Sequence, residues 1–328
     1  MSQNHAHQIK YLISHKDAVY RSYLLHSHLI SIGFHEFILG DITMKKFFLF
    51  TFLSLCSCSV LASELNITLR KMEKQIDGNI GVAVFDSQTN TSWNYNENKR
   101  FNMMSVFKPL ACANVLYDVQ NNQLTFNQKV EIKKTDLISW APITENFVGG
   151  KMSLRSVCGA AMLMSDNYAA NLVLKQIEGP RGLTAFLRTI GDNKTNINNF
   201  EPRVNFSETG TENNTTTPLA LNNTMKKLLI GNVLNTENKT ILKMWMVNDM
   251  FADSLARSVL PRGWNIADKS GAWTGSGSRS LTAMVWKKNR KPLFISIFVN
   301  NSKYKTLPEL NRVIADVSEQ IFEKFDIK

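Results

Sequence analysis

Strand-like segments lie near both ends of the chain, and a long helix-like stretch separates them. Residues 80–96 alternate apolar and polar side chains on both sides of a polar turn, which predicts a β-hairpin. Three further candidate strands follow between residues 264 and 301, and residues 307–325 form an amphipathic closing helix. Residues 104–250 are mostly helical in pattern. This order predicts an α/β fold of the α+β type, in which both chain ends complete an antiparallel sheet and a helical domain is inserted.

The predicted domain boundaries follow from this pattern. Residues 63–103 and 250–328 are expected to form the α/β domain, and residues 104–249 the helical domain, with a functional site at their interface. Within the helical part, Thr217 is a candidate helix cap with Pro218 at the first helical position. Residues 192–217 are rich in Asn, Thr and Glu, and a loop of that length in a compact domain is usually functional.

The first 62 residues are expected to contribute nothing to this fold. Residues 44–62 (MKKFFLFTFLSLCSCSVLA) have a positive start, an apolar core and a small-residue cleavage pattern, which is typical of a secretory signal peptide. We expect cleavage after Ala62 and a secreted, periplasmic protein. We then expect residues 1–43 to be an upstream, non-native extension read from a start codon placed too early, and an unusual N-terminal extension of the protein is the alternative. Around Cys58 the sequence also resembles a lipoprotein cleavage site, which is the alternative form of export.

The histidines exclude whole classes of chemistry. All six of them precede residue 44, so the exported chain contains none. A Ser-His-Asp or Cys-His mechanism is therefore excluded, and so is a zinc site built on histidine. No Cys/Asp/Glu cluster takes the place of such a site, and we expect neither a metal nor another cofactor.

Charge and cysteine content limit the partners and the redox state. The chain has a formal net charge of +11, but its basic residues are scattered and no basic stripe with interleaved aromatic residues occurs, so nucleic-acid binding is not expected. No permanent membrane span is expected either. After residue 62 two cysteines remain, Cys112 and Cys158. A disulfide is the expected state of such a pair in an exported protein, and two buried free thiols are the alternative.

Residues 101–116 (FNMMSVFKPLACANVL) place a serine and a lysine three positions apart in an apolar run. Ser105 and Lys108 share one face of a helix at this spacing. A capping serine and a lysine whose charge reaches solvent would be an ordinary explanation. Without histidine, however, a nucleophilic serine needs another base, and a lysine in an enclosed site can have a lowered pKa.

Three further motifs follow in a fixed order. Ser165-Asp166-Asn167 comes 60 residues after the first serine, Glu201-Pro202-Arg203-Val204-Asn205 lies in the long polar loop, and Lys269-Ser270-Gly271 lies on a predicted strand. Each motif alone is weak evidence, but the order and separations together are specific. They resemble class A serine β-lactamases over essentially the whole exported chain. Residues 259–271 and 278–286 resemble the carbenicillin-hydrolysing group.

The resemblance implies a fold, an activity and residue roles. The fold is the β-lactamase/penicillin-binding transpeptidase-like fold with a five-stranded antiparallel sheet, and the activity is hydrolysis of β-lactam antibiotics through an acyl-enzyme. The implied catalytic residues are Ser105, Lys108, Ser165 and Glu201, with either Lys108 or Glu201 as the acylation base. The implied substrate-binding residues are Trp140, Asn167, Asn205, Lys269, Ser270, Gly271, Ala272 and Arg279. The backbone N–H groups of Ser105 and Ala272 would form the oxyanion hole, and Cys112 and Cys158 match the family disulfide.

The sequence also departs from the family pattern. Asn199 and Asn214 stand where an Arg–Asp ion pair usually holds the base of the long loop. A neutral hydrogen bond of about 0.5–1.5 kcal/mol would replace it, so we expect a more mobile loop and a less restricted substrate range. Trp273 and Thr274 stand where smaller residues are common, and Lys269 where the carbenicillin group usually has Arg.

Two rival functions share part of this pattern. A D,D-peptidase or penicillin-binding protein has the serine, the lysine and Ser-Asp-Asn but lacks a deacylating glutamate. A β-lactam receptor would acylate and stay acylated. Glu201-Pro202 favours the hydrolase, which we expect to be monomeric and to act on penicillins, including carboxypenicillins, and some cephalosporins.

Overall fold

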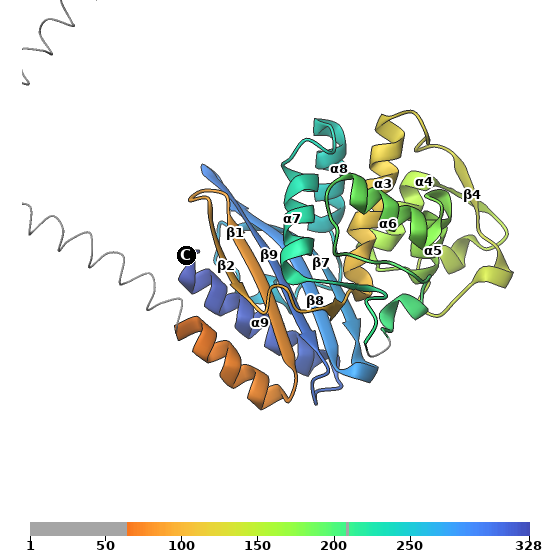
Figure 1. The fold of residues 1–328 in the computed structure, drawn as a ribbon. Coiled ribbons are helices and arrows are strands. Elements are labelled where there is room, and N and C mark those ends of the chain that lie inside the picture. The colour runs from red at the N-terminus through yellow and green to blue at the C-terminus, as the bar shows by residue number, and fades with distance from the viewer. Residues whose placement is uncertain (1–63, 208–209) are drawn as a thin grey trace, which may run out of the picture. The chain divides into compact units, whose positions relative to one another are not determined.

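The computed structural model describes residues 64–207 and 210–328. The predicted signal peptide and the upstream extension lie outside these residues. The main sheet is antiparallel throughout and confirms the predicted fold class. Its five strands are, in spatial order, β2 (Thr91–Tyr95), β1 (Asn79–Asp86), β9 (Arg290–Asn300), β8 (Ser278–Lys287) and β7 (Asn265–Trp273). The predicted hairpin is therefore β1–β2, and the C-terminal strands complete the sheet beside it (Figure 1).

Helices cover both faces of this sheet. On one face lie α9 and the helix over residues 64–76, and on the other lie α7, α8 and the remaining helices (Figure 1). The helices are α3 (Lys108–Gln120), α4 (Leu154–Leu163), α5 (Asn167–Gln176), α6 (Gly179–Thr189), α7 (Pro218–Leu229), α8 (Thr236–Val247) and α9 (Leu307–Lys324). In the part of the chain that the structure describes, none of the helices is long and apolar enough to cross a bilayer.

The alternation of side chains along the strands produces two hydrophobic clusters. On β9, Ile295 and Ile297 pack in the cluster that contains the buried residues of α9, whereas Phe294 and Phe298 pack in the cluster of the inserted helices. Successive residues of a strand point to opposite faces, so one buried strand supplies both clusters. The inserted helices and one face of the sheet therefore share a single core. The boundaries at 103/104 and 249/250 stay a prediction.

Local capping explains where several elements begin. The side chain of Thr217 accepts a hydrogen bond from the N–H of Ala220, and Pro218 begins α7, as the sequence predicted. At α9 the side chains of Thr306 and Glu309 form a reciprocal capping box.

Short elements connect the helices to the site. Two small antiparallel sheets are formed by β3 (Phe101–Asn102) with β6 (Thr215–Thr216), and by β4 (Lys129–Glu131) with β5 (Lys151–Ser153). The 3-10 helices are η1 (Met104–Phe107), η2 (Lys134–Asp136), η3 (Thr144–Phe147), η4 (Arg203–Asn205), η5 (Ala256–Val259) and η6 (Thr274–Ser276). The β3–β6 pair joins the segment before Ser105 to the end of the long polar loop.

The disulfide implied by the family resemblance is not formed in this structure. Cys112 on α3 and Cys158 on α4 are both buried free thiols, so the alternative state that the sequence left open is the one observed. The fold nevertheless brings them together, because the sulfur of Cys112 lies 3.8 Å from the carbonyl oxygen of Cys158. Burial and the neighbouring Cys112 raise the pKa of the Cys158 thiol well above its ordinary value.

The base of the long loop is held by amide groups instead of an ion pair. The Nδ2 group of Asn214 donates to Oδ1 of Asn199 at 2.9 Å and to the carbonyl oxygen of Phe206 at 2.8 Å. Its Oδ1 atom accepts the N–H groups of Asn198 and Asn199 at 3.0 and 3.1 Å. Asn214 has a left-handed backbone with φ of 56°, which asparagine tolerates better than most residues. The predicted neutral replacement is therefore present, and the mobility of the loop stays a prediction.

We predict that Asn214→Asp destabilises the protein by about 1–3 kcal/mol, because it removes the Nδ2 donor and places carboxylate oxygens against carbonyl oxygens. Adding Asn199→Arg to this variant is expected to recover much of the loss by supplying a charged partner. Urea denaturation measures both effects. If Asn214→Asp alone were as stable as the parent, the side-chain amide of Asn214 would not be important for stability.

Candidate active site

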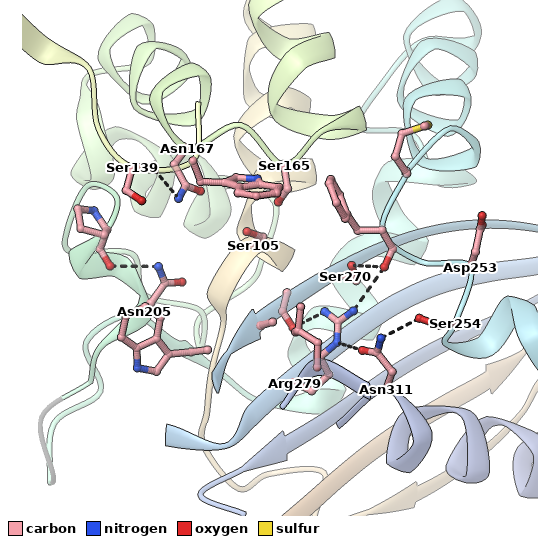
Figure 2. Close-up of a pocket in the computed structure, with 18 residues that line it drawn as sticks. Ser105, Ser139, Ser165, Asn167, Asn205, Asp253, Ser254, Ser270, Arg279 and Asn311 are labelled. Atoms are coloured by element: carbon pink, nitrogen blue, oxygen red, sulfur yellow. Dashed lines mark hydrogen bonds between the residues drawn. The ribbon is translucent and has the colours of Figure 1, made fainter. Parts of the chain in front are cut away.

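The candidate nucleophile Ser105 lies at the start of a helical segment that is fixed from two sides. The N–H of Met103 donates to the carbonyl oxygen of Asn214, and the carbonyl oxygen of Met103 accepts a hydrogen bond from the hydroxyl of Ser280 on β8. Met104 then has a positive φ of 52°, a strained conformation for a residue with a side chain. This turn places Ser105 in η1, directly before α3, and the side chain faces the cavity at the centre of Figure 2.

Lys108 is fully buried one turn further along. Its Nζ atom donates to the carbonyl oxygen of Ser165 at 2.7 Å, to Oγ of Ser165 at 3.2 Å and to Oδ1 of Asn167 at 2.8 Å. Oε1 of Glu201 lies 3.5 Å away. Burial lowers the pKa of Lys108 to about 8, the Glu201 carboxylate opposes this shift, and the charge of Lys269 adds to it.

The Ser165-Asp166-Asn167 loop is positioned by its central residue. The buried carboxylate of Asp166 accepts the N–H groups of Ile143 and Thr144, at 3.0 and 2.9 Å, and caps α5 through the N–H of Ala169 at 2.8 Å. Ser165 has a positive φ of 51°. The loop therefore presents Ser165 and Asn167 to the cavity while Asp166 points into the protein.

Glu201 is held by two asparagines. The side chain of Asn171 on α5 pairs with both backbone groups of Glu201, accepting its N–H at 2.7 Å and donating to its carbonyl oxygen at 3.0 Å. The Nδ2 group of Asn205 donates to Oε2 of Glu201 at 2.7 Å. Among the described residues, no group donates a hydrogen bond to Oε1, which lies buried beside Lys108. One carboxylate oxygen is thus fixed and the other keeps a free lone pair.

Strand β7 presents the Lys269-Ser270-Gly271 motif at the opposite wall. Buried Lys269 donates to Oδ2 of Asp249 at 3.1 Å, and the same oxygen accepts the N–H of Ser270 at 3.1 Å. Burial lowers the pKa of Lys269, and Asp249 opposes the shift. Ser270 lines the cavity, and its hydroxyl donates to Oδ2 of Asp249 at 3.4 Å.

Arg279 on β8 lies beside this motif. It donates from Nη1 to the carbonyl oxygen of Gly271 at 2.9 Å and from Nε to Oδ1 of Asn311 at 2.7 Å. Burial lowers the pKa of Arg279 to about 10, well above neutral pH, so it is cationic there. The site therefore carries two buried cations, Lys269 and Arg279, next to Ser270, which lines the cavity.

Gly271 allows β7 to approach the nucleophile closely. A Cβ atom at this position would lie 2.7 Å from the backbone nitrogen of Ser105 and 2.7 Å from Oγ of Ser280. Only glycine fits such an approach without displacement. The next residue, Ala272, lines the cavity, so the approach brings the two predicted oxyanion-hole segments together.

These residues surround one cavity of about 760 Å³. Nine of the predicted site residues line it: Ser105, Trp140, Ser165, Asn167, Asn205, Ser270, Gly271, Ala272 and Arg279. The three other predicted residues, Lys108, Glu201 and Lys269, are buried behind its wall. Figure 2 shows Asn205 and Arg279 on opposite sides of Ser105. A cavity with a serine, buried ammonium and carboxylate groups and an anion-binding wall is suited to acyl transfer from an anionic amide-like substrate.

Comparisons with known proteins agree with this geometry. A model of the β-lactamase enzyme family matches residues 64–325. The chain is 42% identical to β-lactamase CARB-3 of Pseudomonas aeruginosa over 257 residues. The aligned region covers 78% of this chain and 88% of that protein. The chromosome-encoded β-lactamase of Vibrio parahaemolyticus is 44% identical, with a TM-score of 0.78 over 80% of this chain and 100% of that one. The class A β-lactamase of the last common ancestor of Gram-negative bacteria is 36% identical, with a TM-score of 0.77 over 80% of this chain and 99% of that one. The chain belongs to the class A serine β-lactamases.

Some positioning residues of this β-lactamase were not identified from the sequence. Asn171 lies four residues after Asn167 on the same helix face, a spacing that could have indicated it. Asp249 follows α8 without any sequence signal, because its role depends on the position of β7. Asn311 on α9 is likewise recognisable only through its contact with Arg279.

We predict that Gly271→Ala reduces kcat/KM for nitrocefin at least 100-fold, because the added methyl group forces Ser105 or β7 to move. Steady-state kinetics measure the effect. Gly159→Ala is the matched control, since the nearest atom to its added methyl group lies 3.8 Å away. Near-normal activity of Gly271→Ala would show that the close approach is not required.

Proposed function

We propose that this protein is an exported, monomeric enzyme that hydrolyses penicillins, including carboxypenicillins, and some cephalosporins, and so confers antibiotic resistance. The observation that carries the proposal is the buried contact of 3.5 Å between Lys108 and Glu201, directly behind the cavity that Ser105 faces. The signal-like segment 44–62 supports export to the periplasm, and lipid attachment at Cys58 remains the alternative.

Acylation begins with attack of Ser105 Oγ on the lactam carbonyl carbon. Glu201 takes the serine proton through a water molecule, since its Oε1 is a free acceptor. As the C–N bond breaks, Ser165 gives its proton to the lactam nitrogen and receives one from Lys108, whose Nζ lies 3.2 Å from Ser165 Oγ. The proton that Glu201 took from Ser105 then passes to Lys108, which becomes an ammonium group again. The N–H groups of Ser105 and Ala272 stabilise the oxyanion.

The surroundings of Lys108 favour Glu201 over Lys108 as the acylation base. Every group that Lys108 contacts is an oxygen acceptor, so these contacts stabilise its ammonium form. The nitrogen of an ammonium group has no lone pair with which to accept the proton of Ser105. With a pKa of about 8, about nine in ten molecules carry this charge at pH 7. The charge polarises Ser165 and lies beside the developing negative charge.

Deacylation uses the same carboxylate. Glu201 removes a proton from a water molecule that attacks the ester carbonyl carbon, and Ser105 leaves and recovers its proton. Asn205 fixes Oε2 of Glu201 at 2.7 Å, so that Oε1 faces the water.

Substrate orientation follows from the charge distribution. Arg279 and Lys269 provide the positive potential for the substrate carboxylate, and Ser270 provides a hydroxyl donor. Asn167 and Asn205 offer side-chain amides to the acylamino group on the other side of Ser105, and Trp140 covers the rim.

We predict that Glu201→Gln lowers kcat for benzylpenicillin at least 100-fold and accumulates an acyl adduct on Ser105. Both steps lose their base, but the strained lactam still reacts faster than the unstrained ester, so deacylation becomes the slower step. Mass spectrometry of the intact protein and a Ser105 peptide measures the adduct. Glu237→Gln, at an exposed position of α8, is the matched control. A parent enzyme that forms a lasting adduct without turnover would indicate a penicillin-binding protein or receptor instead.

We predict that the single-turnover acylation rate at saturating benzylpenicillin falls about tenfold per pH unit above pH 8. The pKa of Lys108 is about 8, so the cation that supplies the proton of Ser165 is lost as pH rises through this value. KM is measured separately, because loss of the positive charge on Lys269 at high pH would weaken binding of the substrate carboxylate. An acylation rate that instead rises through pH 8 would assign the base to neutral Lys108.

A further inference from the structure

One end of the main sheet carries a dense group of basic side chains. Residues 287–291 (KKNRK), at the tip of the β8–β9 hairpin, contain four cationic residues. Lys226 and Lys227 in the last turn of α7 lie beside this tip, because they line one surface hollow of about 500 Å³ together with Lys291. The fold thus gathers charges from two distant segments. We call this group the basic end: Lys226, Lys227, Lys287, Lys288, Arg290 and Lys291.

Among the described residues, few carboxylates neutralise the basic end. Asp86 accepts from Arg290 at 3.0 Å, and Asp326, which also acts on Arg290, is itself paired with Lys328. No carboxylate oxygen in that part of the chain lies within 4.0 Å of the Nζ atom of any of the five lysines. The β8–β9 register places Lys287 directly opposite Arg290, and like charges in this position destabilise a strand pair. An anionic partner would relieve this repulsion.

The charges of the basic end are accessible from outside. Its lysines at the hairpin tip and Lys227 are exposed. The Nζ atom of Lys226 lies 3.7 Å from the ring centroid of Phe85 at the surface hollow. Ile230, which is 46% exposed, lines the same hollow. The basic end therefore combines free ammonium groups with a small apolar contact.

Strand β8 separates the basic end from the cavity. Arg279 lies at the cavity end of this strand, and Lys287 lies at its other end. At about 3.4 Å per residue, the two positions are about 27 Å apart. Figure 1 shows the β8–β9 and β1–β2 turns together at this far end of the sheet. A flat surface that contacts the basic end therefore leaves the cavity entrance free.

The composition of the basic end favours a lipid surface over another macromolecule. Five of its six residues are lysines, and lysine is a flexible point charge that suits mobile phosphate groups. Protein interfaces are instead enriched in arginine and depleted in lysine. The nearby ring of Trp264 is in contact with the protein's own cations, at 5.6 Å from Lys287 and 5.3 Å from Arg290, rather than with a stacked base.

We propose that the basic end docks this protein on membrane surfaces that contain anionic phospholipids, with its ammonium groups against the lipid phosphates. Such binding is reversible and sensitive to salt, because a polybasic group without an inserted acyl chain attaches only weakly. This docking goes beyond the proposed function, since hydrolysis in the cavity does not require it.

The test measures cosedimentation of the purified protein with vesicles of phosphatidylcholine, alone or with one third phosphatidylglycerol. Each lysine near an anionic surface strengthens binding about fivefold. We therefore expect the triple variant Lys287→Gln, Lys288→Gln, Lys291→Gln to bind the anionic vesicles about 100-fold more weakly than the parent. Raising the ionic strength from about 0.01 M to about 0.15 M shortens the screening length from about 30 Å to about 8 Å and should weaken binding of the parent at least tenfold.

The matched control removes the same charge elsewhere. Lys129, Lys134 and Lys151 are exposed and lie around β4 and β5, away from the main sheet (Figure 1). Replacing these three lysines by Gln should weaken binding less than about threefold, because only charges within a screening length of the lipid phosphates contribute. Both triple variants should hydrolyse nitrocefin like the parent, which also shows that they are folded.

Three results would overturn the inference. Equal losses in the two triple variants would mean that net charge alone attracts the vesicles. A parent that binds anionic vesicles no better than phosphatidylcholine alone would have no such docking surface. Binding of a DNA duplex but not of the vesicles would assign the basic end to a nucleic acid. The proposed function is tested separately, since it fails only if the parent does not hydrolyse nitrocefin.

Discussion

The buried ammonium group of Lys108 determines how the parts of this site are arranged. A charge without access to water costs several kcal/mol unless hydrogen bonds and an opposite charge compensate it. Here the compensation comes from two other segments, namely the loop of Ser165 and Asn167 and the loop of Glu201. Both loops must therefore lie against α3 for the folded state to be stable. This requirement places the residues that we propose as acid, base and nucleophile around one cavity.

A second buried ion pair, between Lys269 and Asp249, positions the opposite wall of the cavity. Lys269 and Asp249 connect β7 to the segment after α8, and Arg257 reinforces this junction by donating to the carbonyl oxygens of Met246 and Val247 as well as to Asp268. Burial raises the pKa of Asp268 to about 7, although Arg257 opposes the shift. The helical segment and the sheet are thus connected by charges on both sides of the cavity. The close approach at Gly271 then brings β7 to Ser105.

The sequence predicted the parts of this arrangement that depend on local pattern or on fixed motif order. The strands, the cap at Thr217 and the convergence of Ser105, Ser165, Glu201 and Ser270 belong to this group. It did not predict Asp249 or Asn171, because their partners are brought to them only by the tertiary fold. The edge-to-face contact between the rings of Phe206 and Trp273 could not be predicted for the same reason, since the two rings lie in different segments of the chain. The disulfide was predicted from cell compartment and resemblance, whereas the fold itself requires only that the two cysteines pack together.

The role of the buried Lys108–Glu201 pair is tested most directly by a ¹⁵N NMR titration of the Nζ atom of Lys108 in the parent enzyme and in Glu201→Gln. We predict a titration near pH 8 in the parent, and a lower value in the variant because the carboxylate that stabilises the ammonium form is gone. A titration near the ordinary value of about 10.4, or one that the substitution does not change, would contradict a catalytic centre organised by this buried charge pair.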